Sequence, residues 1–374
     1  MRLGVPKEIK TDEHRVGLTP AAVRELARHG HSVLVERGAG IGAGLDDAAY
    51  EQAGARLVAD ADAVFAGAEM IVKVKEPQPE ECRRLRPGQI LFTYLHLAPD
   101  PEQTRLLLAS GATAIAYETV TDAAGRLPLL APMSEVAGRM SVQAAAHALE
   151  KAQGGRGMLL GGVPGVRPAR VVVLGGGVVG TNAARLAIGL GAEVVVIDRS
   201  LNRLKELDAL YGPAMRTLYA TTETIEEAVV TADAVIGAVL VPGAAAPRLI
   251  DRALLGRMQP GAVLVDVAID QGGCFETSRA TTHRAPTYEV DGIVHYCVAN
   301  MPGGVARTST FALTNATLPF VLALADKGVA RALGDDPHLL NGLNIHAGQL
   351  TIEAVAEVQN LTAVTPADAL RHVA

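Results

Sequence analysis

The sequence is poor in aromatic residues and in cysteine. It has no Trp, seven Tyr and five Phe among 374 residues, so base stacking on aromatic side chains is a poor explanation of its function. The three cysteines, Cys82, Cys274 and Cys297, form no C-x-x-C pair, and the histidines form no H-E-x-x-H spacing. We therefore expect no disulfide framework and no metal, and the cysteine pattern favours a reducing cytoplasm.

A basic excess is also absent. There are 34 Lys and Arg against 40 Asp and Glu, a net charge of −6, so nucleic acid is not expected as a partner. The N-terminus, MRLGVPKEIKTDEHR, carries charges where a signal peptide needs an apolar core. The longest uncharged run, residues 308–325, contains four Thr, a Ser, an Asn and a Pro, which is untypical of a membrane span. These features predict a soluble, cytoplasmic protein with no membrane partner.

Short β-branched runs alternate with helical patterns, which predicts an α/β protein built on parallel sheets. Hydrophobic residues make up 49% of the chain, enough for a sizeable core, and the length predicts two or three domains at about 150 residues each. Thr19 and Asp100, each followed by Pro, are expected to cap helices that end at Gly30 and Gly111. Strands of the first part are expected at residues 3–6, 31–36, 70–75, 89–96 and 113–118.

A second series of strands is expected after a long Ala-rich helix over residues 133–151 and a glycine-rich stretch over 154–168. Its strands are expected at residues 170–174, 193–198, 234–239, 262–267 and 293–298, which make a complete open sheet. After Thr308, two or three helices without strands are expected to pack back on the first domain. The predicted division is a substrate domain in two parts, 1–130 and 307–374, with a nucleotide-binding domain, 131–306, inserted between them.

The strongest motif is a glycine-rich turn at residues 175–180, GGGVVG, which follows the apolar run VVVL and opens a helical pattern. In a G-x-G-x-x-G turn, Gly175 permits the tight bend, Gly177 lets the backbone approach a pyrophosphate, and Gly180 lets helix and strand pack closely. Asp198 ends the next expected strand, where a carboxylate accepts a hydrogen bond from a ribose 2′-hydroxyl and repels a 2′-phosphate. The pattern favours NAD over NADP, although Arg199 beside Asp198 weakens the exclusion. The alternative is a glycine-rich packing turn beside a solvated Asp.

Five polar residues are expected at the carboxyl ends of strands, where open parallel sheets bind ligands. They are Arg15, Lys75 and His96 in the first domain and Asp270 and Asn300 in the second. We expect them to face one cleft, because ligands and cofactor use that side of a sheet. The two cations can bind a carboxylate, and the imidazole and the carboxylate are candidate proton carriers. Taken singly, each also fits a solvated charge, a strand-end residue or a turn cap.

Several segments together resemble the alanine dehydrogenase family over nearly the whole chain. They are VPKEIKTDEHRVGLTP, VKVKEP, TYLHLA, PMSEVAGRM, LGGGVVG, IGAVLVPG, VDVAIDQGGCFET and HYCVANMPGGVARTSTFALTN. The resemblance implies reversible oxidation of L-alanine with NAD and water to pyruvate, ammonium and NADH. It also implies a homohexamer of chains with two Rossmann-like, doubly wound parallel-sheet domains, the NAD domain inserted into a discontinuous substrate domain.

The same resemblance implies roles for particular residues. Arg15 and Lys75 bind the carboxylate and carbonyl region of the substrate, and His96 and Asp270 form the proton donor and acceptor pair. Asn300, from its place after a strand, is a further candidate for substrate binding. One departure is Ala220, where relatives often carry a serine that touches the nucleotide. To the cofactor residues Gly175, Gly177 and Gly180 of the glycine turn, the resemblance adds NAD contacts from Ser134, Val178, Val179, Asp198, Arg203, Val239, Leu240, Val267, Ala268, Ile269, Asp270, Arg279, Val298, Ala299, Asn300 and Met301.

Two other functions stay open at this point. The NAD-binding part of a proton-translocating transhydrogenase shares the ancestry, but it usually carries an arginine-rich stretch where this chain has only GRLPLLAP at residues 125–132. A non-catalytic NAD-binding scaffold is the alternative from another class. The sequence also leaves open which of His96 and Asp270 acts as acid or base.

Overall fold

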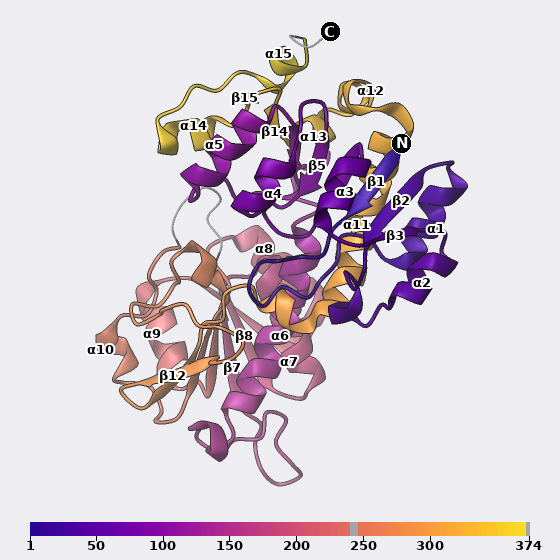
Figure 1. The fold of residues 1–374 in the computed structure, drawn as a ribbon. Coiled ribbons are helices and arrows are strands. Elements are labelled where there is room, and N and C mark those ends of the chain that lie inside the picture. The colour runs from indigo at the N-terminus through magenta and orange to yellow at the C-terminus, as the bar shows by residue number, and fades with distance from the viewer. Residues whose placement is uncertain (240–245, 372–374) are drawn as a thin grey trace. The chain divides into compact units, whose positions relative to one another are not determined.

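A computed structural model describes residues 1–239 and 246–371 of the chain. The chain forms two compact units: unit 1 comprises Met1–Met133 and Gly303–Ala374, and unit 2 comprises Ser134–Pro302. Each unit has a mainly parallel sheet with helices on it, as Figure 1 shows. The expected fold class is therefore confirmed: the protein is α/β, and in sequence one unit is inserted into the other.

The sheet of unit 1 has eight strands in the order β15-β14-β6-β5-β4-β1-β2-β3. The strands from β6 to β3 are parallel, whereas β14 and β15 run antiparallel to their neighbours at one edge. The strands are β1 (Arg2–Val5), β2 (Ser32–Glu36), β3 (Arg56–Val58), β4 (Met70–Val72), β5 (Ile90–Thr93), β6 (Thr113–Ala116), β14 (Leu343–His346) and β15 (Gln349–Leu350).

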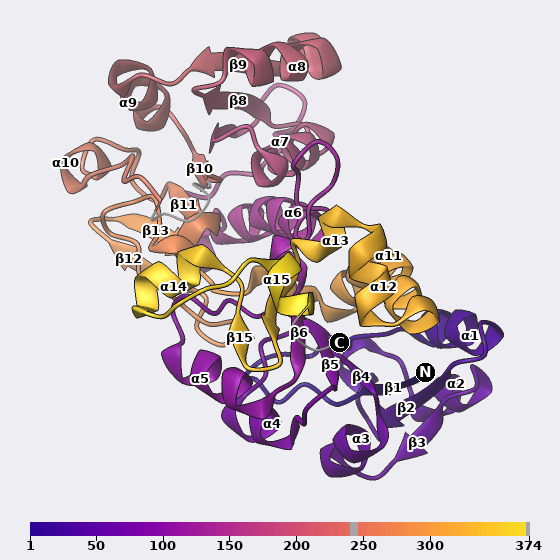
Figure 2. The ribbon, with the colours of Figure 1, turned by 90° about the horizontal axis from the view of Figure 1, so that it is seen from above.

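The helices of unit 1 cover both faces of this sheet. Figure 2 shows α3, α4 and α5 on one face, with α1 and α11 on the other. As predicted, Thr19 and Asp100 cap α1 and α5 with their side chains, and Gly111 ends α5 in the left-handed conformation. The helices are α1 (Pro20–Arg28), η1 (Ile41–Ala43), α2 (Asp47–Gln52), α3 (Ala61–Gly67), α4 (Pro79–Arg84), α5 (Pro101–Ser110), η2 (Tyr117–Thr119), α11 (Ala306–Lys327), α12 (Val329–Asp335), α13 (Pro337–Leu340), α14 (Glu353–Gln359) and α15 (Pro366–Arg371).

The C-terminal segment differs from the sequence prediction. We expected helices without strands after Thr308, and this was wrong, because β14 and β15 extend the sheet of unit 1. β14 pairs with β6, and the His346 ring and the Thr113 hydroxyl are hydrogen-bonded at 2.9 Å between Nδ1 and Oγ1. A strand of four residues is too short to show a clear alternation of apolar and polar residues. The extended conformation of β14 depends instead on its pairing with β6.

One helix in the described residues is long and apolar enough to cross a membrane, by length and composition alone. It runs over Met301–Lys327 and includes the uncharged run 308–325. In its most apolar window 44% of the residues are buried inside the protein, and core helices of soluble proteins pass the same test. Its buried polar residues include Ser309, Thr310 and Thr317.

The sheet of unit 2 has seven strands in the order β12-β13-β11-β10-β7-β8-β9, all parallel except β12. The edge strands β9 and β12 were not predicted. The strands are β7 (Arg170–Leu174), β8 (Glu193–Asp198), β9 (Met215–Tyr219), β10 (Ala234–Gly237), β11 (Val263–Asp266), β12 (Thr287–Val290) and β13 (Ile293–Tyr296). The helices within unit 2 are η3 (Lys151–Gln153), α7 (Val178–Gly189), α8 (Leu201–Tyr211), η4 (Gly212–Ala214), α9 (Thr222–Val230), α10 (Arg252–Leu255) and η5 (Val267–Gln271). Two helices cross the unit boundaries in the chain, α6 (Ala131–Ala148) at the start of unit 2 and η6 (Met301–Val305) at its end.

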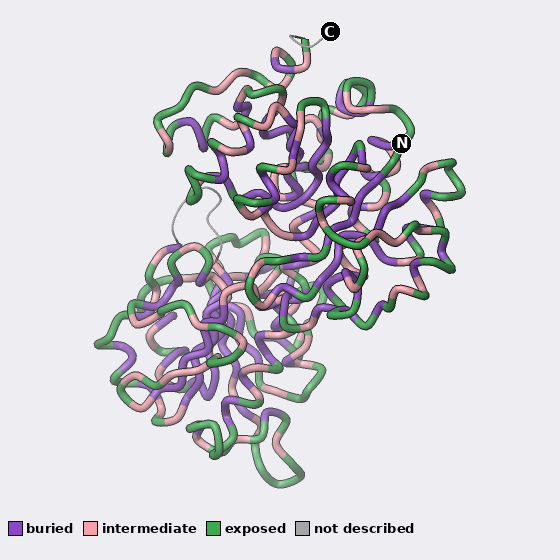
Figure 3. The backbone as a smooth tube through the Cα atoms, viewed as in Figure 1, coloured by how far each residue is buried: buried purple, intermediate pink, exposed green. Residues whose placement is uncertain are grey.

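Alternate residues of each central strand enter different cores in unit 2. Val171 and Val173 of β7 pack with residues of α6 and α7, whereas Val172 and Leu174 pack with residues of α9 and α10. Figure 3 shows the strands of this sheet as the most deeply buried part of the unit. The sheet is covered on both faces, which is why its strands read as continuous apolar runs.

Candidate functional site

Arg15 lies in the loop after β1 and is almost completely buried. Its Nε and Nη2 donate to the two carboxylate oxygens of Glu13 at 2.7 and 2.5 Å, and its Nη1 lies 3.1 Å from Met133 Sδ. Burial by itself lowers the pKa of Arg15, but the hydrogen bonds and the charge of Glu13 outweigh it and raise this pKa. The guanidinium therefore stays charged inside the protein, and Glu13 fixes its orientation.

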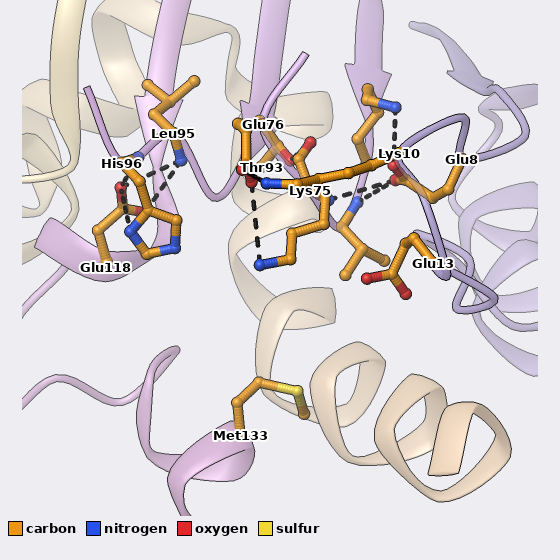
Figure 4. Close-up of polar contacts among 12 residues, drawn as sticks. Glu8, Lys10, Glu13, Lys75, Glu76, Thr93, Leu95, His96, Glu118 and Met133 are labelled. Carbon is orange, nitrogen blue, oxygen red and sulfur yellow. Dashed lines mark hydrogen bonds and ion pairs between the residues drawn. The ribbon is translucent and has the colours of Figure 1, made fainter. Parts of the chain in front are cut away.

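Lys75 lies in the loop after β4, with its side chain 15% exposed and its Nζ 3.9 Å from Glu76 Oε2. The expected strand over 70–75 ends early, at Val72. The reason is that the backbone N–H groups of Val74 and Lys75 donate to Glu8 Oε1, at 2.6 and 3.4 Å, instead of continuing the strand ladder. The Lys75 carbonyl accepts from Thr93 Oγ1 at 2.9 Å, so the loop after β4 is joined to the last residue of the neighbouring strand β5 (Figure 4).

A buried ion triad next to this loop was not predicted from the sequence. Lys73 Nζ donates to Glu8 Oε2 at 2.9 Å and to Glu81 Oε1 at 2.7 Å, and all three side chains are excluded from water. Burial raises the pKa of Glu8, while the charge of Lys73 opposes that rise. The one signal in the sequence was a second lysine inside the apolar run MIVKVK. Because Glu8 also holds the backbone at Lys75, the triad helps to position that loop.

His96 lies in the loop after β5, which ends at Thr93 and not at His96 as predicted. Beyond the strand, the N–H groups of Leu95 and His96 donate to the carboxylate of Glu118, the latter at 2.6 Å. His96 has a positive φ of 47°, its ring stacks on Tyr94 with centroids 5.7 Å apart, and its Nδ1 lies 3.8 Å from Glu118 Oε1 (Figure 4). A carboxylate that was not predicted thus orients a strained loop and its imidazole.

These three groups share one edge of the sheet in unit 1. Arg15, Lys75 and His96 follow the carboxyl ends of β1, β4 and β5, which are neighbouring parallel strands. Tyr94 is buried at the same edge, where burial raises the pKa of its hydroxyl and the charge of Arg15 opposes that rise. Two cations and an imidazole at one sheet edge can bind a carboxylate and carry a proton.

The glycine turn of unit 2 has the conformation that its sequence predicts. Gly175 has a φ of +100°, and Gly177 is the N-cap residue of α7, with no side chain to cap the helix. A Cβ at Gly180 would lie 1.8 Å from the Gly175 carbonyl oxygen, whereas a Cβ at Gly177 would meet nothing within 4 Å. Gly180 is therefore required by packing within the unit, while the space at Gly177 suits a close ligand.

Asp198 and Arg203 hold this turn from β8 and α8. The Asp198 carboxylate accepts from the N–H of Gly176 at 2.6 Å and from the N–H of Ser200 at 2.7 Å. Arg203 Nε donates to the Gly176 carbonyl at 2.7 Å, and its Nη2 donates to Thr181 Oγ1 at 2.6 Å. An uncapped helix N-terminus for a pyrophosphate and a carboxylate beside it for a ribose fit a dinucleotide.

Most of the other implied cofactor residues follow the carboxyl ends of parallel strands in unit 2. Val239 comes after β10, Val267 to Asp270 form most of η5 after β11, and Val298 to Met301 come after β13. Ser134 lies in α6, and the Arg279 guanidinium lies 4.0 Å from the centre of the Tyr288 ring. Leu240 lies outside the described residues.

Asp270, the candidate proton carrier of unit 2, and Asn300, its candidate substrate-binding residue, lie in these loops. Asp270 is exposed on η5, and Asn300 has a positive φ of 60° and a carbonyl 3.1 Å from His283 Nε2. Among the described residues no group of three or more His, Cys, Asp and Glu side chains could hold a metal ion. The chemistry of unit 2 is thus that of a dinucleotide turn with a carboxylate on a neighbouring loop.

Comparison with known proteins agrees with this geometry. The family models for the N-terminal and C-terminal domains of alanine dehydrogenase/PNT match residues 4–137 and 141–353. A protein named alanine dehydrogenase from Halomonas elongata is 65% identical over 98% of this chain and 99% of its own length. A solved L-alanine dehydrogenase is 54% identical, with a TM-score of 0.93 over 96% of this chain and 99% of that chain.

A transhydrogenase from Sinorhizobium meliloti is a more distant neighbour. Its structure is 26% identical to this chain, with a TM-score of 0.80 over 94% of this chain and 98% of that one. The fold is thus shared with transhydrogenase, but the sequence similarity is much greater to proteins named alanine dehydrogenase. With both family models matching and a relative at 65% identity over nearly its full length, the chain belongs to the alanine dehydrogenase/PNT family.

Proposed function

We propose that this protein catalyses the NAD-dependent, reversible oxidative deamination of L-alanine to pyruvate and ammonium. The observation that carries the proposal is the 65% identity over 98% of this chain to a protein named alanine dehydrogenase. The geometry supports it independently, because unit 2 holds a dinucleotide turn, and in unit 1 two cations and an imidazole follow the carboxyl ends of neighbouring parallel strands. A carboxylate-bearing substrate and a hydride-accepting cofactor are what these groups suit.

NAD, when bound, accepts a hydride at nicotinamide C4. The residues that would hold it are the turn from Gly175 to Gly180, Asp198 and Arg203, with the loops after β10, β11 and β13. Domain roles follow from this: we propose that residues 131–306 bind NAD and that 1–130 with 307–374 bind the substrate. A cytoplasmic location and a homohexamer are proposed from the family resemblance alone.

The substrate-side chemistry requires a neutral amine, because the α-carbon loses hydride readily only when the nitrogen lone pair forms an iminium. In the proposal Arg15 and Lys75 bind the substrate carboxylate, and their positive charge disfavours an ammonium beside them. Fixing the α-carbon in this way contributes up to about 7–11 kcal/mol of barrier reduction in the best cases. Glu13 supports this role by holding the Arg15 guanidinium in place.

Water must then add to the iminium carbon, and ammonium must leave. We propose His96 and Asp270 as the pair that takes a proton from this water and returns a proton to the departing nitrogen. The Glu118 carboxylate lies 3.8 Å from His96 Nδ1, and it accepts from the backbone N–H of His96, so Glu118 supports this role by helping to fix where the ring lies. Asn300 is assigned to substrate binding.

The test is NADH formation from a panel of L-amino acids in alkaline buffer, followed by absorbance. We expect L-alanine to be oxidised much faster than larger amino acids. Hydride exchange between NADH and an NAD analogue without any amino acid would instead support transhydrogenation. NADH binding without turnover of any amino acid would indicate a scaffold.

The direction of the reaction should depend on pH. Oxidative deamination releases protons, so we expect alkaline buffer to favour alanine oxidation and near-neutral buffer to favour amination of pyruvate. Initial rates in both directions across this pH range test the scheme. A ratio of forward to reverse rates that does not change with pH would contradict it.

Asp198→Ala should narrow the preference for NAD over NADP. The carboxylate that repels a 2′-phosphate would be gone, and the Gly176 N–H would lose its partner. The ratio of kcat/KM for NAD to that for NADP measures the effect. Unchanged discrimination would show that another residue reads the ribose.

Gly180→Ala should mainly lower the stability of the protein, whereas Gly177→Ala should mainly weaken the binding of NADH. Gly180→Ala places a methyl group against the Gly175 carbonyl, so we expect a loss of about 1–3 kcal/mol of stability. Gly177→Ala meets open space, so stability should change by less than about 0.5 kcal/mol while NADH binding weakens. Thermal unfolding and NADH fluorescence titration separate the two, and equal losses of stability would refute these separate roles of the two glycines.

A further inference from the structure

Asp266, the last residue of β11, is a completely buried carboxylate whose role was not predicted from the sequence. Its Oδ1 accepts from the N–H of Ala268 at 3.1 Å and lies 3.4 Å from the thiol of Cys274. Its Oδ2 accepts from the N–H of Cys274 at 2.9 Å and from the hydroxyl of Ser278 at 2.5 Å. Burial raises its pKa, and these hydrogen bonds oppose that rise. Four donors around one carboxylate make it the centre of the loop after β11.

The donors lie on both sides of the segment that carries Asp270. Ala268 belongs to η5, whereas Cys274 and Ser278 come after the turn formed by Gly272 and Gly273, both with positive φ. A Cβ at Gly273 would lie 2.7 Å from Asp266 Oδ2, so the turn closes tightly over the carboxylate. Asp266 therefore fastens the start and the end of the segment 267–273 to one point.

We propose that Asp266 is a positioning residue, which holds the η5 segment so that Asp270 and the preceding cofactor-binding backbone keep their working orientation. Asp266 has no exposed surface, so it acts through its neighbours and not by touching substrate. The consequence for catalysis rests on the proposed function, whereas the effect on the segment does not. An ordinary structural carboxylate would stabilise the fold without any special effect on Asp270.

Asp233 provides a matched control in the same sheet. It is also buried, and it lies at the amino end of β10, the strand that pairs with β11. Its carboxylate accepts from Arg156 Nη1 at 2.7 Å and from the N–H of Arg170 at 2.8 Å. Asp233→Asn therefore also removes a buried, hydrogen-bonded carboxylate. Asp233, however, lies at the amino ends of the strands, whereas η5 follows their carboxyl ends.

The experiment compares Asp266→Asn with Asp233→Asn. In Asp266→Asn one carboxylate oxygen is replaced by an NH₂ group, which donates hydrogen bonds and cannot accept the one that the protein donates to that position. At least one of the four hydrogen bonds is therefore lost, and we expect residues 267–273 to be held less firmly. Hydrogen exchange of residues 267–273 should become faster in Asp266→Asn only, and kcat for alanine should fall about 10²-fold, since small misplacements have effects of this size. KM for alanine should stay near the wild-type value, because the residues assigned to substrate binding, Arg15, Lys75 and Asn300, all lie outside the segment 267–273. Asp233→Asn should lower the melting temperature while leaving kcat and this exchange unchanged.

The outcomes separate the two proposals. Unchanged exchange or unchanged kcat in Asp266→Asn, or an equal fall of kcat in both variants, would overturn the positioning role. A wild-type protein without alanine oxidation, together with faster exchange in Asp266→Asn only, would refute the proposed function and leave the structural role of Asp266 standing.

A milder variant covers the case in which Asp266→Asn does not fold. Ser278→Ala removes one of the four donors and leaves the carboxylate in place. We expect a several-fold fall of kcat and a smaller increase of exchange over 267–273. Wild-type values for both would count against the proposal.

Discussion

Asp270→Asn is expected to lower kcat for alanine oxidation by about 10²- to 10⁴-fold, the usual contribution of a positioned proton carrier. Asn has nearly the same size but cannot take up a proton at neutral or alkaline pH. Because Asp270 is exposed on η5, the substitution should not unfold the protein. Steady-state rates of NADH formation measure kcat, and fluorescence titration should show that NADH still binds.

Asp251→Asn is a suitable control for this variant. Asp251 caps α10 in the same unit, where its Oδ1 accepts from the N–H of Leu254 at 2.8 Å. Its replacement should leave kcat unchanged. If Asp270→Asn kept the turnover of the wild-type protein, Asp270 would be removed from the mechanism, and His96 would be the remaining candidate for both proton transfers.

Lys73→Met is expected to destabilise the protein by about 3–5 kcal/mol, the range for removing one partner of a buried ion pair. The ammonium is the shared partner of Glu8 and Glu81, and without it two carboxylates would face each other out of contact with water. A methionine side chain has a similar length but carries no charge. Urea unfolding followed by circular dichroism measures the loss.

Lys75→Met tests whether this loss is specific to the triad. Lys75 lies two residues further on, with a partly exposed side chain at the candidate substrate site. Its replacement should destabilise the protein less than Lys73→Met does, because the Lys75 side chain keeps some contact with water, and it should strongly lower kcat/KM for alanine. A Lys73→Met protein as stable as the wild type, or a Lys75→Met protein as active, would contradict the division of roles between the two lysines.

The features that could be predicted are those whose cause lies within a few residues. The turn from Gly175 to Gly180 needs glycine for reasons of local backbone geometry, and Thr19 and Asp100 cap their helices with side chains only three residues from the N–H groups that they bind. The apolar runs of β7 and β8 matched their predicted bounds for the same kind of reason. Helices cover both faces of this sheet, so the side chains that point to either face are apolar. Such a strand is therefore seen in the sequence as a continuous apolar run.

The features that could not be predicted depend on partners far away in the chain. Just beyond the ends of β4 and β5, the carboxylates of Glu8 and Glu118 accept from the backbone N–H groups of Val74 and His96, across 66 and 22 residues of sequence, and the chain leaves the strand conformation there. β14 is a strand because β6, more than two hundred residues earlier, offers it an edge. Local patterns specify which groups a segment can offer for bonding. Which distant group bonds to them depends on the free energy of the whole packed unit. The roles of Lys73, Glu118 and Asp266 follow from such tertiary contacts, so they could not be predicted from local patterns.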